Sequence, residues 1–512
     1  MIPNHVDQSM LSADQVTLTP LIQGVGNHPV LQDSSITLTR AELVQRVSGL
    51  AEHLQANHIK RLALHADNGI AWILVDLACQ QAGILCVPLP VFFNKMQALH
   101  LLHTCGIDAL LTSEPALFAA YFLQATEVPG LGLNLLLQPA ARQPLLPDST
   151  GKVTFTSGST GTPKGVCLST AQQLLQAAAL AKVVALKQPR HLCVLPLSTL
   201  LENIAGVYAP LLAGGTVILR SMAELGFVGS RLSDSQKFLQ TISLVKPDTL
   251  ILIPQLLQLL VHAVKQGWQA PPLQFIAVGG ARVSAELITE ARRLGLPVYE
   301  GYGLSECASV VSLNTPQADQ PGSSGKPLAH LGISLEDGEI HVSGNTMLGY
   351  VDEPDSWYRK RIATGDLGFL DNSGFLHISG RSKNLLISSY GRNISPEWVE
   401  SELLASPVLS EAVVLGDARP HCVALLTPAR PDLPDTVIAA AIAAANTRLP
   451  DYAQVKQWLR LARPLAGQTD FITTNGKPRR KRIEQAWQTE IDALYGATPA
   501  LQTMQEPQES VL

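Results

Sequence analysis

The sequence predicts an α/β fold: a large N-terminal domain of stacked α/β subdomains with mainly parallel sheets, followed by a small α+β C-terminal domain. From about residue 38 to residue 380, short runs rich in Val, Ile and Leu alternate with stretches whose apolar residues recur at helical spacing. This alternation favours parallel sheet. The pattern changes after Gly380, and 512 residues suffice for roughly three domains or subdomains at ~150 residues each.

The large domain, residues 1–380, contains short apolar runs and amphipathic stretches that predict its strands and helices. We expect strands at residues 61–64, 109–112, 153–155, 216–219 and 275–278, and helices at 41–56 and 70–82. Residues 127–150 concentrate prolines and glycines, a composition that is unfavourable for core elements. We therefore expect a linker between two subdomains in this segment.

The small domain, residues 384–496, has its own start signal for a helix. Ser395 is a capping residue, Pro396 suits the first helical position and Glu397 places an acid in the first turn. Strands are expected at 385–388, 412–415 and 423–426, and an alanine-rich helix at 437–449. Residues 497–512 are polar and rich in Pro and Gln, which predicts a disordered tail.

The charge balance and the apolar content narrow the function classes. The 37 basic and 42 acidic residues give a net charge of −5, which argues against a generic polyanion-binding protein. Only 15% of the residues are charged, so membrane insertion has to be considered. Two long uncharged stretches, 203–219 and 249–264, are interrupted by proline and by glycine or polar residues, and they predict buried core elements rather than spanning helices. With no secretory leader in the sequence, we expect a cytoplasmic protein without a transmembrane segment.

The seven cysteines are scattered and odd in number, and no two of them form a C-x-x-C pair. This spacing argues against a zinc site and against a disulfide framework. The sequence predicts reduced cysteines that lie mostly in the core.

The strongest local motif directly follows the predicted strand at 153–155. It combines five hydroxyl residues, three glycines and a lysine in the order Thr156, Ser157, Gly158, Ser159, Thr160, Gly161, Thr162, Pro163, Lys164, Gly165. Glycines allow close backbone approach, hydroxyls and amides can donate to phosphate oxygens, and lysine adds positive charge. The motif is not a Walker A loop, because no G-K-[ST] is present. It predicts a phosphate-binding loop, and the alternative is a flexible surface turn.

Further motifs follow along the chain, and each has an ordinary explanation when taken alone. Tyr302 fits a half-buried core aromatic, Asp366 a turn former, and Lys477 one member of a solvated basic run. The motifs are Val278-Gly-Gly-Ala-Arg282, Glu300-Gly-Tyr-Gly-Leu-Ser-Glu306, Gly338-Glu-Ile340 with Gly344, Gly349-Tyr350, Ala363-Thr-Gly-Asp-Leu-Gly368, Ile378-Ser-Gly-Arg-Ser-Lys383, Tyr390-Gly-Arg-Asn-Ile-Ser-Pro-Glu397 with Glu400, and Thr474-Asn-Gly-Lys-Pro-Arg-Arg480.

Taken together and in this order, these motifs resemble those of the adenylate-forming superfamily, which includes acyl-CoA synthetases, luciferases and the adenylation domains of peptide synthetases. The resemblance covers roughly residues 38–482. It implies an acid–thiol ligase. A carboxylate oxygen attacks the α-phosphorus of ATP, pyrophosphate leaves, and the thiol of coenzyme A then displaces AMP from the acyl-adenylate. Joining two anions in this way requires concentrated positive charge and oriented donors.

The resemblance also implies a role for individual residues. It assigns the β- and γ-phosphates of ATP to residues 156–165, the adenine to Gly280, Ala281, Arg282 and Tyr302 with the adjoining Gly303, the α-phosphate to Ser305, Mg²⁺ to Glu306, and the ribose hydroxyls to Asp366 and Arg381. Lys477, together with Glu306 and Ser305, is implied to be catalytic. The small domain is implied to be mobile, with residues 381–383 as the hinge at Lys383 and Gly391 facing the thiol channel.

The acid and the acceptor are less well defined. The family often has a histidine or an aromatic residue in a P-L-x-H pattern after the phosphate loop, whereas this sequence has Thr199 there. The implied pocket segments, 203–212 and 275–281, hold no acidic residue, which favours an apolar acid, a fatty acid of medium or long chain. An acyl carrier protein as acceptor, and a non-catalytic acyl- or nucleotide-binding homologue, are the alternatives. Peripheral membrane contact suits such a substrate, and binding of nucleic acid is disfavoured.

Overall fold

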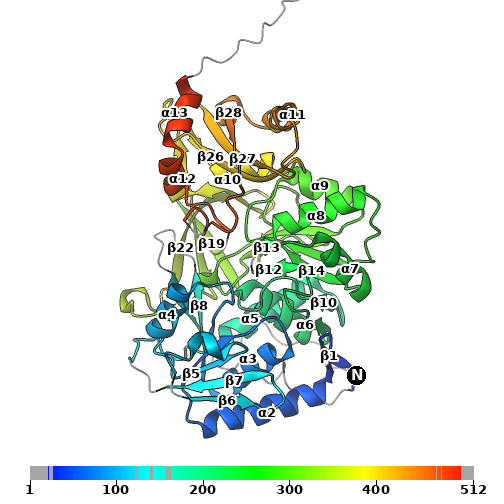
Figure 1. Ribbon diagram of the computed structural model, residues 1–512, viewed down its shortest axis with the longest axis vertical. Helices are drawn as coiled ribbons and strands as arrows, with labels where there is room; N and C mark the ends of the chain where they lie inside the picture. The colour runs from blue at the N-terminus through cyan, green and yellow to red at the C-terminus, as the bar shows by residue number, and fades with distance from the viewer. Residues whose placement is uncertain are drawn as a thin grey trace, which may run out of the picture. The chain divides into compact units, whose positions relative to one another are not determined.

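The computed structural model describes residues 21, 27–122, 124–138, 142–156, 163–229, 231–468, 470–473 and 476–496. The chain divides into two compact units, Met1–Lys383 and Asn384–Leu512, which are described separately below (Figure 1). The predicted disordered tail, 497–512, and residues 157–162 of the predicted phosphate loop lie outside the described residues.

A nine-stranded sheet runs through the first unit and is parallel in its middle and antiparallel at its edges. In spatial order its strands are β18 (Lys326–Pro327), β17 (Ser312–Leu313), β16 (Val298–Tyr302), β15 (Phe275–Val278), β14 (Thr249–Leu252), β10 (Arg190–Leu192), β11 (Thr216–Ile218), β1 (Pro29–Gln32) and β2 (Thr37–Thr39). The predicted strands at 216–219 and 275–278 are confirmed.

An eight-stranded sheet forms the second layer of strands in this unit. In spatial order its strands are β21 (Gly349–Tyr350), β9 (Lys164–Leu168), β8 (Lys152–Thr156), β4 (Leu85–Pro88), β3 (Arg61–His65), β5 (Ala109–Thr112), β7 (Leu133–Leu137) and β6 (Gln124–Val128). The strands from β8 to β5 are parallel, whereas β9 and β7 pair antiparallel with their neighbours. The predicted α/β class is therefore confirmed, with mixed rather than purely parallel sheets.

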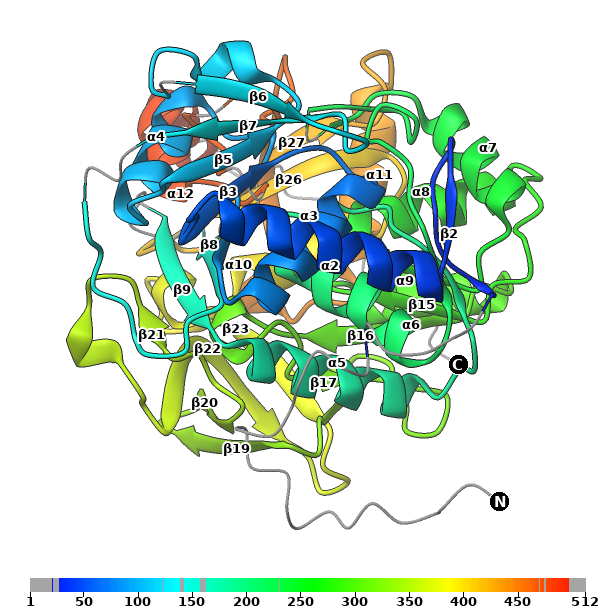
Figure 2. The ribbon, with the colours of Figure 1, turned by 90° about the horizontal axis from the view of Figure 1, so that it is seen from below.

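The expected linker at 127–150 is wrong for its first part. Strand β7 pairs antiparallel with β5 and with β6, so this segment extends the eight-stranded sheet at its edge (Figure 2). Pro129 lies just outside the strands, and Gly130 and Gly132 adopt positive φ angles of 75° and 64° in the hairpin turn between them. The prolines and glycines that suggested a linker are thus turn residues of a β-hairpin.

Helices cover the two large sheets. They are α2 (Arg40–Ala56), α3 (Ile70–Ala82), α4 (Lys95–Thr104), α5 (Thr170–Val184), α6 (Ala209–Leu212), α7 (Ser235–Val245), α8 (Pro254–Lys265) and α9 (Ala285–Arg293). Helix α2 begins at a capping box formed by Thr39 and Glu42 and lies alongside α3 (Figure 2). Most residues of α3 are buried, including Asp76, so this helix is enclosed rather than amphipathic. A π-helix, Glu202–Tyr208, precedes α6 directly.

A third sheet of the first unit is antiparallel, and the alternating sequence pattern did not predict it. Its strands, in spatial order, are β19 (Leu331–Glu336), β20 (Glu339–Gly344), β22 (Arg361–Leu370) and β23 (Leu376–Arg381). A short ribbon joins β12 (Phe227–Val228) to β13 (Arg231–Leu232). The 3-10 turns of this unit are η2 (Pro115–Phe118), η4 (Ser305–Cys307), η5 (Pro354–Ser356) and η6 (Ser382–Asn384), the last of which ends one residue into the second unit.

The second unit is a small α+β domain, as predicted. Its elements are β24 (Leu386–Ile387), β25 (Asn393–Ile394), α10 (Pro396–Leu403), β26 (Leu409–Leu415), β27 (Cys422–Pro428), α11 (Asp435–Asn446), η7 (Asp451–Ala453), β28 (Val455–Arg460), α12 (Arg480–Ala486) and α13 (Gln488–Gly496). Ser395 accepts a hydrogen bond from the backbone N–H of Trp398, so the predicted cap of α10 is confirmed. The strands β26, β27 and β28 form one sheet, in which β27 and β28 are parallel.

All seven cysteines are buried and none is in a disulfide, which agrees with the prediction of reduced core cysteines. Within the described residues, no helix combines the length and the apolar character needed to cross a bilayer. The uncharged stretch 249–264 forms β14 and most of α8, and the stretch 203–219 forms most of the π-helix together with α6 and β11.

Candidate active site

The predicted phosphate loop connects two antiparallel strands of the eight-stranded sheet. Thr156 ends β8 and pairs in register with Lys164, the first residue of β9. Residues 157–162 between them lie outside the described residues. The Lys164 ammonium lies 2.8 Å from Glu353 Oε1 and 4.7 Å from the centroid of the Tyr350 ring. Glu353 and the ring of Tyr350 thus hold the Lys164 side chain at the end of the segment that carries the predicted phosphate loop.

Glu306, the predicted Mg²⁺ ligand, contacts the same tyrosine. The hydroxyl of Tyr350 donates to Glu306 Oε1 at 2.9 Å. Burial and the Glu306 carboxylate raise the pKa of the Tyr350 hydroxyl, so it remains a donor at neutral pH. The structure therefore joins Lys164 and Glu306 through Tyr350. Gly349-Tyr350 is one of the motifs that carry the resemblance, but no role was assigned to this tyrosine. The pairing of Gly349–Tyr350 with β9 places it beside Lys164.

Tyr302, Asp366 and Arg381 form a second group in the first unit. The hydroxyl of Tyr302 donates to Asp366 Oδ2 at 2.7 Å, and Arg381 Nε donates to Asp366 Oδ1 at 2.7 Å. Asp366 and Arg381 are register partners on β22 and β23. Each carboxylate oxygen retains a free lone pair, so Asp366 can accept further hydrogen bonds. The residues assigned to adenine and ribose are therefore neighbours.

The glycines of the two central motifs are required by close packing. A Cβ atom at Gly303 would lie 1.7 Å from the carbonyl oxygen of Ser309, so only glycine fits there. Gly280 has a φ of 81°, a conformation that glycine adopts without strain. Ala281 follows it, and Arg282 donates from Nη1 to the carbonyl of Ile378 on β23 at 2.6 Å. The turn after β15 is thereby tied to the sheet that carries Asp366.

Glu300 begins the motif that ends at Glu306, and it is buried. Burial raises the pKa of Glu300 to about 8, although Arg282 and a hydrogen bond from Ser324 act in the opposite direction. A carboxyl group with such a pKa is largely protonated at neutral pH. Ser305 lies between the two acids in the turn η4 and is partly exposed.

The second unit carries Lys477 in a tight turn. The backbone N–H of Lys477 donates to Thr473 Oγ1 at 3.0 Å, and its carbonyl accepts from the N–H of Thr473 at 2.8 Å. Gly476, just before it, has a φ of 74°. The Lys477 side chain is exposed. Lys477 belongs to Asn384–Leu512, whereas Glu306 and Asp366 belong to Met1–Lys383.

Arg480 follows this turn and ends the motif at 474–480, and its contacts do not fit the alternative explanation of a solvated basic run. It forms ion pairs with Glu400 at 2.5 Å and Glu397 at 3.1 Å. Burial raises the pKa of Glu400 to about 7, with Arg480 acting against the rise. The arginine ties the start of α12, and hence the Lys477 turn, to α10. Only the fold reveals this pair, because 80 residues separate Arg480 from Glu400.

Two predicted residues lie close to the start of the second unit. Lys383 is the last residue of the first unit and lies in the turn η6. Gly391 has a φ of 72° and closes a turn by donating its N–H to the carbonyl of Ser388 at 2.8 Å. Tyr390 beside it is 77% exposed, so this turn presents an aromatic side chain to solvent.

The segment with the unusual Thr199 leads into the π-helix. Thr199 stands where the family often has a histidine or an aromatic residue. Its hydroxyl donates to the carbonyl of Pro196 at 2.6 Å and closes a turn. After it, Leu201 and Ala205 are partly buried and pack against both large core clusters of the first unit, as does Ala277 on β15. These three small or aliphatic residues mark an apolar boundary between the two cores.

A buried polar group lies beside this boundary. His191, Cys193 and Glu202 each place one polar atom within 4.8 Å of the other two. His191 Nε2 lies 3.1 Å from Glu202 Oε1, and its Nδ1 lies 2.8 Å from Thr249 Oγ1. The histidine thus links the π-helix to β10 and β14. Its spacing from Glu202 resembles no metal-binding motif, so the sequence did not indicate this group.

Comparison with known proteins places this geometry in one family. The AMP-binding enzyme model matches residues 22–351, and the model of the AMP-binding enzyme C-terminal domain matches residues 383–499. The chain therefore belongs to the AMP-binding enzyme family, and the resemblance to adenylate-forming enzymes is confirmed. It is an enzyme of the acid–thiol ligase type.

Three curated relatives illustrate the similarity. The 2-succinylbenzoate–CoA ligase of Bacillus subtilis (strain 168) is 28% identical over 74% of this chain and 80% of its own length. The feruloyl-CoA synthase of an Amycolatopsis species is 30% identical over 78% and 87%. The long-chain-fatty-acid–CoA ligase FadD15 of Mycobacterium bovis is 26% identical over 85% and 88%.

The solved structures of the Bacillus subtilis ligase have the same fold. The complex with ATP and magnesium ion has a TM-score of 0.73 at 26% identity and covers 91% of this chain and 98% of that one. The complex with the acyl-adenylate intermediate has a TM-score of 0.74 and covers 91% and 97%. Those structures hold the nucleotide, the metal ion and the intermediate that the motifs of this chain imply.

Proposed function

We propose that this protein activates a carboxylic acid with ATP to an acyl-adenylate and transfers the acyl group to coenzyme A. The observation that carries the proposal is that the first unit contains two groups of residues, each held together by its own contacts. One joins Lys164 to Glu306 through Tyr350, and the other joins Tyr302 and Arg381 through Asp366. Both consist of family-motif residues, and the named relatives are CoA ligases.

In the first half-reaction, a carboxylate oxygen of the acid forms a bond to the α-phosphorus of ATP while the bond to the β-phosphate oxygen breaks. Pyrophosphate leaves with the electron pair. No general base is needed, because the nucleophile is already ionised. In this proposal Lys164 and residues 156–162 hold the leaving phosphates, and Lys477 bridges the carboxylate and the α-phosphate. A lysine suits this task, since its compact charge lies on a flexible stem.

In the second half-reaction, the sulfur of coenzyme A bonds to the acyl carbon while the bond from that carbon to the phosphate oxygen of AMP breaks. AMP leaves with the electron pair, and the thiol proton is released to solvent. The small domain, residues 384–496, is proposed to rotate about the hinge 381–383, so that Lys477 withdraws and the turn at Gly391 faces the thiol. The two compact units meet in the sequence between Lys383 and Asn384, and this position is compatible with such a movement.

Mg²⁺ fits the donors around Glu306. The carboxylate is a hard oxygen ligand, and the Tyr350 hydroxyl donates to one of its oxygens, which fixes its orientation while leaving the other for a cation. When bound, the ion supplies charge neutralisation for the phosphates. The carboxylate of Asp366 is proposed to accept hydrogen bonds from the ribose hydroxyls at its remaining lone pairs. Its hydrogen bonds from Arg381 and Tyr302 hold it in place.

The acid is proposed to be apolar, with a medium- or long-chain fatty acid as the first candidate. Support comes from the partly buried Leu201, Ala205 and Ala277, which present only aliphatic surface at the boundary between the two cores. An aryl acid is the second candidate, because two of the three relatives are named for 2-succinylbenzoate and for ferulate. An acyl carrier protein as the acceptor has no counterpart among these relatives.

A pyrophosphate-release assay over a panel of alkyl and aryl acids, with and without coenzyme A, tests the proposal. We expect release that depends on ATP, Mg²⁺ and one class of acid, together with acyl-CoA formation. Release without acyl-CoA would indicate another acceptor, such as a carrier protein. No release with any acid would leave only a non-catalytic binding role.

A further inference from the structure

A fully buried polar network surrounds one side of the π-helix, Glu202–Tyr208. We call Asp76, Lys152, Asn203 and Tyr208 the Asp76 network. Lys152 Nζ lies 2.8 Å from Asp76 Oδ1 and donates to Tyr208 Oη at 3.1 Å. Asn203 Nδ2 donates to Asp76 Oδ2 at 3.1 Å, and its oxygen accepts from Lys152. The Tyr208 hydroxyl also donates to Asp76.

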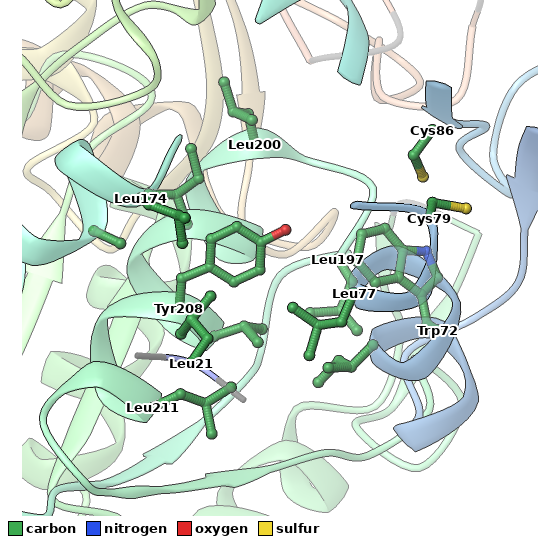
Figure 3. Packing of buried hydrophobic residues seen from close by; sticks show 14 of the residues in the cluster. Leu21, Trp72, Leu77, Cys79, Cys86, Leu174, Leu197, Leu200, Tyr208 and Leu211 are labelled. Atoms are coloured by element: carbon green, nitrogen blue, oxygen red, sulfur yellow. The ribbon is translucent and has the colours of Figure 1, made fainter. Parts of the chain in front are cut away.

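The network joins three elements that are distant in sequence. Asp76 lies on α3, Lys152 begins β8, which leads into the phosphate loop, and the other two residues lie on the π-helix. The side chains of Lys152 and Asp76 are 1% and 0% exposed. Tyr208 is surrounded by Leu174, Leu200 and Leu211, and its hydroxyl points away from them toward α3 (Figure 3). A charged pair in such surroundings is stable only if its hydrogen bonds are complete.

The type of helix determines whether Asn203 and Tyr208 can both reach the ion pair of Asp76 and Lys152. Asn203 and Tyr208 are five residues apart. In an α-helix, five steps of about 100° would leave them about 140° apart around the axis. In a π-helix, residues five apart stack on one another, because each N–H bonds to the carbonyl five residues earlier. The N–H of Ala209 bonds to the carbonyl of Ile204 in this way.

Pro210 disfavours the α register through its ring. Proline has no N–H, so it makes neither the α-helical bond to the Gly206 carbonyl nor the π-helical bond to the Ala205 carbonyl, but in an α-helix its ring would also clash with the Gly206 carbonyl. The Gly206 carbonyl instead lies 3.9 Å from the Cys193 sulfur, within reach of its thiol. The ring clash thus weakens the α register, and the Asp76 network contacts two side chains that lie five residues apart on the helix.

The π-helix makes a second buried contact, apart from the Asp76 network. Glu202 contacts His191. A Cβ atom at Gly206 would lie 2.6 Å from Glu202 Oε1 and 2.7 Å from His191 Nε2, so glycine is needed beside the pair. In residues 201–208, Leu201 and Ala205 are the partly buried residues, and both lie at the boundary between the cores.

We propose that the Asp76 network holds this helix in the π register and thereby sets which side chains line the acid pocket, so that Asn203, Tyr208 and Lys152 are positioning residues for acid selectivity. The inference rests on the proposed function, in which this segment forms the acid pocket. Loss of the register rotates the helix by one residue, which replaces the small Ala205 by a different side chain at the boundary.

The test compares Tyr208→Phe with Thr112→Val. The first removes a hydroxyl from the network and keeps the ring. The control removes the buried hydroxyl of Thr112 on β5, a strand of the eight-stranded sheet that also holds Lys152. This hydroxyl lies 2.9 Å from His65 Nδ1. The readout is the ratio of kcat/KM for a long and a short member of the accepted acid class. Changing the pocket by one methylene is worth about 10- to 200-fold, so we expect Tyr208→Phe to change the ratio at least about tenfold.

The double variant Pro210→Ala with Tyr208→Phe also removes the clash of the proline ring with the Gly206 carbonyl, so it is expected to change the ratio further. Lys152→Met combined with Asp76→Asn provides a network variant without a buried unpaired charge. In all variants the KM for ATP is expected to stay within about twofold, because the ATP residues are not touched. A selectivity ratio that stays at the wild-type value in Tyr208→Phe and in both double variants, while wild-type protein is active, overturns this inference alone. Inactive wild-type protein overturns the proposed function with it.

Discussion

The buried Glu300 predicts how the stability of the first unit depends on pH. The folded-state pKa of about 8 lies above the ordinary value of 4.5 because the carboxyl is buried, and Arg282 and Ser324 counteract the burial in part. The folded protein therefore binds a proton that the unfolded chain has released. Its contribution to stability is complete below about pH 4.5 and is lost as the pH rises through about 8.

The magnitude follows from the two pKa values. At ~1.4 kcal/mol per pKa unit, the difference between 4.5 and about 8 corresponds to roughly 5 kcal/mol over the whole range. The slope is about 1.4 kcal/mol per pH unit between roughly pH 5 and 8. Glu300→Gln keeps a neutral hydrogen-bonding group of the same size, and we expect it to remove this slope. The variant should be less sensitive to alkaline pH than the wild type.

Thermal unfolding of both proteins at pH 5, 6, 7, 8 and 9 is the assay. The melting temperature of Glu300→Gln relative to wild type is expected to rise steadily from pH 5 to 8 and then to level off. Glu306→Gln is a matched control, since this acid lies in the same motif and is only partly buried. Parallel melting curves for Glu300→Gln and wild type across this range would refute the reasoning.

Three further variants test the site. Lys477→Ala is expected to lower adenylate formation, measured by pyrophosphate release, by more than about 100-fold. It is expected to spare thioester formation from supplied acyl-AMP, measured as acyl-CoA. Equal loss of both activities would contradict separate conformations for the two steps. Tyr350→Phe removes the donor to Glu306, and the Mg²⁺ concentration for half-maximal rate is expected to rise about 10- to 100-fold; an unchanged Mg²⁺ dependence would show that Tyr350 does not orient Glu306 for the ion. Asp366→Asn weakens a charge-assisted pair and is expected to raise the KM for ATP at least about tenfold with the KM for the acid unchanged; a rise in the acid KM alone would place Asp366 elsewhere in the reaction.

Local sequence signals were sufficient for much of the fold. The helix Ile70–Ala82 and the strand Phe275–Val278 have the predicted bounds, because periodicity and length are properties of the segment itself. The cap at Ser395 was likewise readable from three consecutive residues. The hairpin of β6 and β7 was missed, since its turn prolines and glycines look like a linker unless the pairing of Leu133–Leu137 with β5 is known.

The site was predictable to the extent that its residues lie in motifs. Tyr302, Asp366 and Arg381 were selected from sequence, and the fold brings them into contact. Tyr350 and Arg480 also lie in motifs, but their contacts with Glu306 and Glu400 were not predicted, because these partners lie far along the chain. The π register was also out of reach, because it depends on Lys152, whose partner Asp76 lies on a different element and whose burial no local pattern reveals.

The central claim is that the first product is an acyl-adenylate. The most direct measurement incubates the protein with ATP, Mg²⁺ and the accepted acid without coenzyme A, and detects bound acyl-AMP by mass spectrometry after quenching. We predict one acyl-AMP per active chain, converted to AMP and acyl-CoA when coenzyme A is added. Formation of acyl-CoA with ADP and phosphate, and with no acyl-AMP in the quenched sample, would contradict the account.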